Sequence, residues 1–134
     1  GDGRVIGGDF YDVFELASGD WIVAIGDVCG KGVEAAALAA VVRQILRAEA
    51  VHTPRLDRLL AAVNRVLLDL GNDRYTSLLV VRVPPEGSRR QLSLCAGGHP
   101  LPLVRPPDGP SAAVGRHGSL VGVFADAVYH QVEV

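Results

Sequence analysis

The sequence predicts a single α+β domain in which, along the chain, two strands are followed by two helices and then by a second group of strands. Three observations favour this class. The first 28 residues have the short-range mix of aromatic, β-branched and polar residues that is typical of a strand hairpin. Residues 33–70 have apolar positions at helical spacing. The remainder returns to short strand-like runs, and this segregation of helices and hairpins argues against a parallel β-α-β fold.

The predicted hairpin consists of two strands, residues 8–17 and 21–27, which are joined by a turn at residues 18–20. With a three-residue turn, Asp27 pairs with Tyr11. Asp9 and Asp27 then share one face of the hairpin, and Asp12 points to the other. A two-residue turn would reverse this facing, so the pairing is a prediction for the structure to test.

Two helices are predicted next. The first spans residues 33–50, and its alanine-rich composition favours a helix that packs closely against its neighbour. The second follows Thr53 and Pro54, read as an N-cap and a first helical position, and stops at Gly71. Apolar positions recur in the first helix at 33, 36, 37, 40, 41, 45 and 48. In the second, Leu56, Leu59, Leu60, Val63, Val66, Leu67 and Leu70 share one face, opposite Arg55, Asp57, Arg58, Asn64, Arg65 and Asp69.

The last part of the chain reads as strands separated by turns that contain proline and glycine. Leu92, Leu94 and Ala96 are expected on one face of the second of these strands. The prolines of the third suit an edge position. The predicted strands are residues 75–83, 90–96, 101–105 and 127–134.

Composition excludes several classes of protein. The chain is 49% apolar and 21% charged, which is ordinary for a globular domain. Its formal net charge of −2 offers no excess of positive charge for nucleic acid. No apolar run is long enough to span a membrane, and no signal peptide is visible, so we expect a cytoplasmic protein. Cys29 and Cys95 form no disulfide framework and are expected to be small thiols. The chain starts at Gly1 without Met, so it is either processed or a piece of a longer protein.

Carboxylates and glycines gather at the open end of the predicted hairpin. Residues 7–12 (GGDFYD) enter the first strand, and residues 26–32 (GDVCGKG) leave the second and open the helix. Paired carboxylates are costly unless a cation compensates them, and hard oxygen ligands suit Mg²⁺ or Mn²⁺. The following helix start favours a phosphate nearby. Together these features point to phosphoryl chemistry at Asp9 and Asp27, with Asp12 interpreted as structural.

Other candidates are weaker. The segment around Lys31 is not a P-loop, because only three residues separate Gly26 from Gly30 and glycine follows the lysine. Lys31 is equally compatible with a solvated position and with a phosphate contact. His99, in a Gly-Gly-His-Pro turn, fits a loop-shaping residue better than a general acid, and the remaining histidines fit the surface. Covalent catalysis has no supporting motif.

The ordered set of motifs resembles the PPM (type 2C-like) metal-dependent protein phosphatases, and among them the bacterial SpoIIE/RsbU branch. The set continues beyond the hairpin with Tyr75-Thr76, with residues 96–100 (AGGHP) and with residues 119–122 (SLVG). Each motif is weak by itself. Their order and spacing over nearly the whole chain make the resemblance specific.

The resemblance implies an α-β-β-α layered β-sandwich flanked by helices, with a binuclear Mn²⁺ or Mg²⁺ site at one end. Asp27 matches the aspartate that bridges both metals, the carbonyl of Val28 matches a further ligand, and Asp9 matches the acidic residue that supports the cluster. In such enzymes a metal-bridging water attacks phosphorus directly. The proposed catalytic pair is therefore Asp9 and Asp27.

The resemblance also implies the biological role: removal of phosphate from phosphoserine or phosphothreonine on a regulatory partner protein. In this branch the partner is usually an anti-sigma-factor antagonist, and a sensor domain controls the phosphatase; a homodimer is compatible with it. Family members carry two later aspartates that bind metal, and this chain has neither. Residues 1–134 are therefore expected to be one incomplete phosphatase domain, inactive in isolation.

Two rival functions stay open. One is a catalytically degenerate phosphatase fold that acts by protein binding, which the retained Asp9 and Asp27 count against. An Asp-Gly motif in the following stretch of the parent protein would favour the enzyme. The other is a Mg²⁺-dependent nucleotide hydrolase, for which the sequence offers neither a base pocket nor a phosphate loop.

Overall fold

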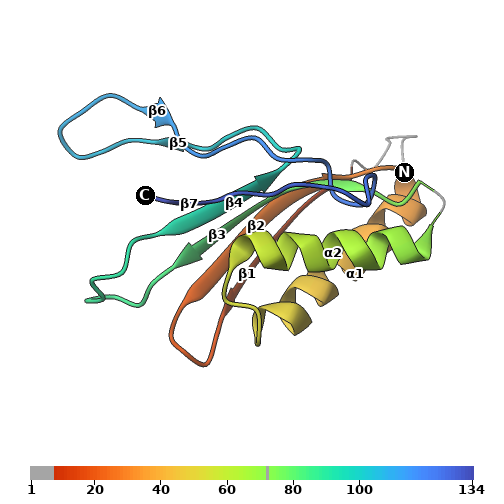
Figure 1. Ribbon diagram of the computed structural model, residues 1–134, viewed down its shortest axis with the longest axis horizontal. Coiled ribbons are helices and arrows are strands. Elements are labelled where there is room, and N and C mark those ends of the chain that lie inside the picture. Colours follow the sequence, from red (N-terminus) through yellow and green to blue (C-terminus); the bar gives the residue numbers. More distant parts are fainter. Residues whose placement is uncertain (1–7, 72) are drawn as a thin grey trace.

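The computed structural model describes residues 8–71 and 73–134 and confirms the α+β class (Figure 1). Five strands form one antiparallel sheet in the order β1-β2-β3-β4-β7, and β5 pairs with β6 in a separate ribbon. The elements are β1 (Asp9–Glu15), β2 (Trp21–Val28), α1 (Gly32–Ala50), α2 (Leu56–Leu70), β3 (Thr76–Val83), β4 (Ser93–Gly97), β5 (Leu103–Val104), β6 (Ala112–Ala113) and β7 (Gln131–Glu133).

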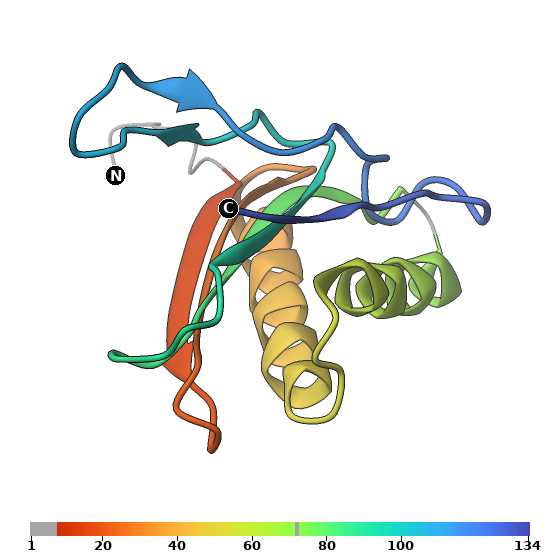
Figure 2. The same cartoon turned by 60° about the vertical axis from the view of Figure 1, so that its left-hand side comes forward.

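Both helices lie against one face of the five-stranded sheet (Figure 2). Strands β1 and β2 alternate strictly between exposed and buried residues, and the buried set faces the helices. The main core lies between helices and sheet. Its largest fully buried side chains include Ile22, Leu46, Leu56, Leu59, Leu60, Leu67, Leu78, Val80 and Val121.

The opposite face of the sheet, which we call the outer face, is covered only in part. Over β3 and β4, a second small core is formed by Leu79, Leu94 and Ala96. It packs against Leu101 and Val114, which come just before β5 and just after β6 in the sequence. Over β1 and β2 the apolar side chains are exposed, with Tyr11 at 73%. The exposed set on these two strands is Tyr11, Val13, Trp21, Val23 and Ile25.

The hairpin register differs from the predicted one by two residues. Glu15 pairs with Trp21, and Asp27 pairs with Asp9 rather than with Tyr11. The loop is displaced by one residue: Leu16 N donates to Asp20 O at 2.8 Å and closes a three-residue loop of residues 17–19 instead of the predicted residues 18–20. A shift of two leaves every side chain on its predicted face. Asp9 and Asp27 therefore do share a face.

The first helix is placed correctly, but the predicted apolar positions are not the ones it buries. The buried residues are Ala35, Leu38, Val42, Leu46 and Ala50, whereas Val33 is 85% exposed. Alanine and valine occur all round this helix, so periodicity alone does not identify its inner face.

The second helix begins later than predicted. It starts at Leu56, so Thr53 and Pro54 belong to the connection, and no side chain caps its first turn. Asn64, predicted on the polar face, is buried: its Oδ1 accepts from Gly122 N at 2.7 Å, and its Nδ2 donates to Phe124 O at 3.0 Å. Gly71 ends the helix as predicted, with a φ of 68°.

The strands that follow lie where the sequence places them, although the third and fourth are short. The structure adds one strand, β6, which the sequence did not indicate. Within the described part of the chain, no helix is long and apolar enough to cross a bilayer.

Candidate metal centre

The first and last residues of the hairpin meet at one corner of the sheet. Asp9 begins β1 and Asp27 is the penultimate residue of β2, and the two are direct partners in the antiparallel ladder. Val28 N donates to Gly8 O at 2.9 Å, so the neighbouring Asp9–Asp27 pair is of the non-hydrogen-bonded kind, in which side chains approach most closely. Two exposed carboxylates are thus held side by side on the outer face.

Gly8 opens room for oxygen atoms beside this pair. A Cβ on Gly8 would collide with the carbonyl oxygen of Val28 and would lie 2.9 Å from Oδ1 of Asp27. The Val28 carbonyl and the Asp27 carboxylate therefore converge on the space that the missing side chain leaves free. Hard oxygens that converge in this way suit Mg²⁺ or Mn²⁺. The residues present fit the predicted metal, although no cluster of three or more Asp, Glu, His or Cys side chains that could hold an ion exists among the described residues.

Two hydroxyl groups of β3 fix the backbone of Asp27. Thr76 Oγ1 lies 2.7 Å from Ser77 O and 3.1 Å from Asp27 O and shares its one proton between these carbonyls, and Asp27 N donates to Ser77 Oγ at 3.2 Å. Thr76 is fully buried. Sequence reasoning noted Thr76 only as the start of a strand and did not assign a role to Ser77. Adjacent hydroxyl residues at the start of the strand that pairs with a candidate metal-binding strand are the signal that could have found them.

His99 lies at the same corner. Its Nδ1 is 2.9 Å from Ser77 Oγ, and its ring lines a hollow of about 320 Å³ together with Asp9, Tyr11, Ile25 and Gly26, among others. Burial lowers the pKa of His99, while the carboxylates of Asp27 and Asp9 act in the opposite direction. Ser77 Oγ thus links the ring of His99 to the backbone N–H of Asp27, a connection that the sequence did not indicate.

Asp12 lies away from this corner, on the helix side of the sheet. It is buried, and Arg47 of α1 binds it in a bidentate manner. Arg47, assisted by Arg43, holds the pKa of Asp12 below its usual range. Asp12 is thus a packing residue that joins β1 to α1, as interpreted from the sequence.

The segment between β2 and α1 carries two further candidates. Lys31 is exposed just before the helix and makes no side-chain cap. Cys29 is half-buried: its Sγ donates to Asp73 O at 2.7 Å, and its backbone N donates to Tyr75 O at 3.0 Å. Cys95 is buried, and both cysteines are free. Gly7 lies outside the described residues.

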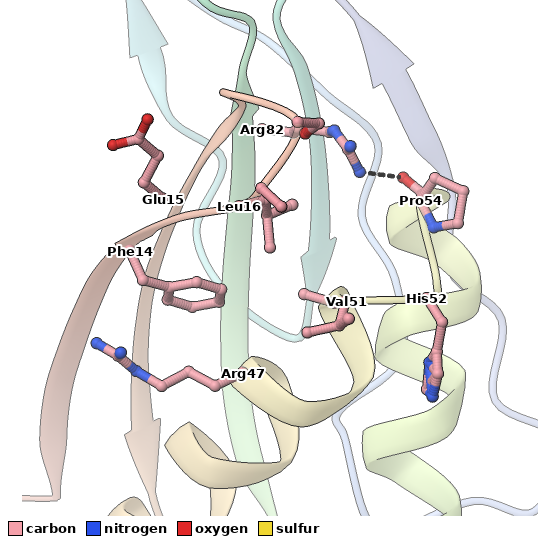
Figure 3. Close-up of a pocket in the computed structure, with 11 residues that line it drawn as sticks. Phe14, Glu15, Leu16, Arg47, Val51, His52, Pro54 and Arg82 are labelled. Carbon is pink, nitrogen blue, oxygen red and sulfur yellow. Dashed lines mark hydrogen bonds between the residues drawn. The ribbon is translucent and has the colours of Figure 1, made fainter.

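A separate hollow of about 430 Å³ lies at the opposite end of the hairpin (Figure 3). Phe14 and Leu16 border it on one side and Val51 on another, and Arg82 Nη1 donates to Pro54 O at 3.0 Å on its rim. It shares no lining residue with the hollow beside Asp9. The carboxylate pair and this hollow are therefore distinct features.

Comparison with protein families gives one match that covers most of the chain. A family model described as stage II sporulation protein E (SpoIIE) matches residues 17–134. One curated relative, protein IcfG of Synechocystis sp. (strain ATCC 27184 / PCC 6803 / Kazusa), is 41% identical over 61 residues. That stretch is 46% of this chain and 10% of protein IcfG.

Several solved structures have the same fold as this chain. The RsbU and RsbW domains of Rv1364c from Mycobacterium tuberculosis superpose with a TM-score of 0.78 at 24% identity, over 100% of this chain and 37% of that one. The SiaA-PP2C domain of Pseudomonas aeruginosa gives 0.75 at 20% identity, over 98% and 55%. RsbX in complex with magnesium gives 0.69 at 19% identity, over 98% and 63%. The chain thus spans between about a third and two thirds of these solved chains.

Proposed function

The chain belongs to the SpoIIE family of PP2C-type serine/threonine phosphatase domains, and from this premise we propose that it removes phosphate from phosphoserine or phosphothreonine on a regulatory partner protein. The single observation that carries the proposal is the pairing of Asp9 with Asp27 at one corner of the sheet. Two like charges opposite each other on adjacent strands destabilise the fold unless a cation lies between them. A structural role alone gives no reason to keep them there.

Asp9, Asp27 and the carbonyl of Val28 are the residues that we propose to bind Mn²⁺ or Mg²⁺. Bound divalent ions would supply an activated water and would neutralise charge on the phosphoryl group. The chain itself holds the oxygens in place: Thr76 and Ser77 fix Asp27, and Gly8 keeps the space beside it free. The adjoining start of α1, with Lys31 exposed before it, is suited to a phosphate.

We further propose that residues 1–134 are part of a longer phosphatase domain that carries the remaining metal ligands. The described residues contribute two carboxylates where a binuclear site needs more. The apolar outer face of β1 and β2 supports the same view, since an exposed row of large apolar side chains normally packs against another layer. The solved relatives are also longer than the part that this chain matches.

The proposed substrate is the phosphorylated form of an anti-sigma-factor antagonist, acted on in the cytoplasm under the control of a sensor domain. Support for this finer assignment comes from the RsbU branch that the sequence resembles and from the solved RsbU-containing protein with the same fold. A homodimer remains compatible with this assignment.

The decisive experiment measures Mn²⁺-dependent release of phosphate from a phosphoserine protein by the protein that carries this domain. Asp27→Ala is expected to reduce the rate by about 100-fold or more, because a metal contributes several kcal/mol to the transition state. Asp108→Ala, on an exposed loop, is the matched control. Undiminished activity of Asp27→Ala would refute the site assignment.

The same experiment separates the rival function. A catalytically degenerate module would bind its partner without any Mn²⁺-dependent release of phosphate, and Asp27→Ala would leave that binding unchanged. Calorimetry of Mn²⁺ binding then reports whether the carboxylate pair still holds an ion.

A further inference from the structure

Three residues at the candidate metal centre, one through its backbone N–H and two through their side chains, are joined by consecutive hydrogen bonds. Asp27 N–H donates to Ser77 Oγ at 3.2 Å, and Ser77 Oγ lies 2.9 Å from His99 Nδ1. A backbone N–H can only donate, so Ser77 accepts on one side. Its own hydroxyl proton is then available to the other side, where His99 Nδ1 is its described neighbour.

The direction of this chain selects one tautomer of His99. If Ser77 donates to Nδ1, the proton of the neutral imidazole is on Nε2. If Nδ1 donated instead, the Ser77 hydroxyl proton would have no acceptor among the described residues and would be left to solvent. The arrangement with the proton on Nε2 therefore keeps both hydrogen bonds of Ser77 within the protein.

His99 lies at the same corner of the sheet as the two carboxylates. The ring lines the hollow of about 320 Å³ that also contains Asp9 and Gly26, and the charges of both Asp9 and Asp27 reach it. Within the described ranges, the hydrogen bond of His99 to a side chain is the one through Nδ1. An N–H at Nε2 would therefore be a hydrogen-bond donor on the residue that lines this hollow beside the carboxylates.

We propose that His99 binds a phosphoryl oxygen of the substrate through Nε2–H and that Ser77 is the positioning residue that fixes this tautomer. This inference rests on the proposed function of the centre and adds two residues to it. The one hydroxyl of Ser77 makes both contacts: it donates to Nδ1 of His99 and accepts from the backbone N–H of Asp27. The phosphate monoester is the class of ligand to which the donor is directed.

The tautomer can be tested without any metal or turnover. Nitrogen chemical shifts of the ¹⁵N-labelled imidazole rings, measured in the metal-free chain near pH 7.5, distinguish a proton on Nε2 from one on Nδ1. Signals of His99 are assigned by their loss in His99→Gln. We expect the Nε2–H form in the wild type and in Ser77→Thr, and a mixture of tautomers in Ser77→Ala. A wild-type Nδ1–H form would overturn the proposal.

The contact to substrate can be tested by two substitutions that keep different edges of the ring. His99→Asn retains a polar group near the position of Nδ1, and His99→Gln retains an N–H near the position of Nε2. With p-nitrophenyl phosphate, Mn²⁺ and the protein that carries this domain, we expect KM to rise about 10-fold in His99→Asn, as is typical of a lost hydrogen bond to a charged group, and to rise less in His99→Gln. Equal KM values for both variants and the wild type would overturn the proposal.

Two controls separate this inference from the proposed function. His117→Gln, on an exposed loop, is expected to behave as the wild type. If Asp27→Ala retains full activity, the metal centre itself is misassigned. If Asp27→Ala is inactive while the His99 and Ser77 variants match the wild type, the inference fails and the proposed function stands.

Discussion

The carboxylate of Asp12 on β1 accepts two hydrogen bonds from the guanidinium of Arg47 on α1, each 2.7 Å long. The same guanidinium lies over the ring of Phe14, 4.8 Å from its centre. Asp12 is 3% exposed, and the ion-pair partners that the described residues give it, Arg47 and Arg43, both belong to α1. This pair ties the helix to the hairpin that carries the candidate metal centre.

This pair predicts a dependence of stability on pH. Arg47 lowers the pKa of Asp12 in the folded chain, so the folded state holds its proton less tightly than the unfolded state does. The stabilisation is therefore present above the unfolded pKa of about 4 and is lost as pH falls through the lower folded pKa. Asp12→Asn is expected to cost about 1–3 kcal/mol at pH 7, and the difference should shrink towards pH 2.5. Urea unfolding of both proteins measures it, and a difference that does not change with pH would contradict the prediction.

Two arginines at Asp20 are expected to contribute unequally. Arg82 Nε donates to Asp20 Oδ2 at 2.6 Å and also binds Pro54 O, and its side chain is 15% exposed. Arg90 binds the same carboxylate but is 57% exposed. We expect Arg82→Ala to lower the free energy of unfolding by about 3 kcal/mol and Arg90→Ala to lower it by clearly less, because water screens the exposed guanidinium. Arg89→Ala is the matched control on the same exposed segment. Equal losses for the first two variants would argue against burial as the deciding factor.

Gly26 is expected to be irreplaceable for steric reasons. A Cβ there would collide with Ser77 O and lie 2.7 Å from the ring of Phe10. Gly26→Ala should lower the free energy of unfolding by about 1–3 kcal/mol and weaken Mn²⁺ binding at the adjacent Asp27. Gly87→Ala meets nothing within 4 Å, but its φ of 83° should cost about 1–2 kcal/mol without any effect on Mn²⁺. Unchanged Mn²⁺ affinity in Gly26→Ala, measured by calorimetry, would disprove this difference.

The two thiols are expected to react at very different rates. Burial raises the pKa of Cys95 to about 12, whereas Cys29 is half-buried near the end of β2. With Cys29→Ser, labelling of Cys95 by a disulfide reagent at pH 8 should be about 1,000-fold slower than that of a free thiol, because so little thiolate is present. Labelling should become fast in urea. Rapid labelling of native Cys29→Ser would show that Cys95 is accessible.

Patterns in the sequence were sufficient to predict most elements, and the reasons for the exceptions are local. The second helix has one apolar stripe, so Leu56, Leu59 and Leu60 were correctly predicted on its inner face. The first helix is apolar on several sides, so its inner residues, such as Leu38, become evident only when the sheet is in place. Asn64 was misassigned because its partners, Gly122 and Phe124, are about 60 residues away in sequence.

The candidate centre was predictable only to the level of the motif. Asp9 and Asp27 stand out because glycines surround them at two strand ends, and they do lie side by side. The contributions of Ser77 and His99 depend on the pairing of β2 with β3 and on the loop after β4, so the hydroxyl residue at the start of β3 becomes informative only once that pairing is known. Whether Asp9, Asp27 and Val28 bind metal stays a prediction.

The strict alternation of side chains along β1 and β2 makes the centre sensitive to the place of an insertion. A residue added to the loop of residues 17–19 lengthens the loop and leaves Asp9 paired with Asp27. A single residue added inside β1, between Asp9 and Glu15, turns Asp9 over, so that its carboxylate would enter the core. Homologous hairpins that keep the centre should therefore vary in length at the turn but not within the two strands.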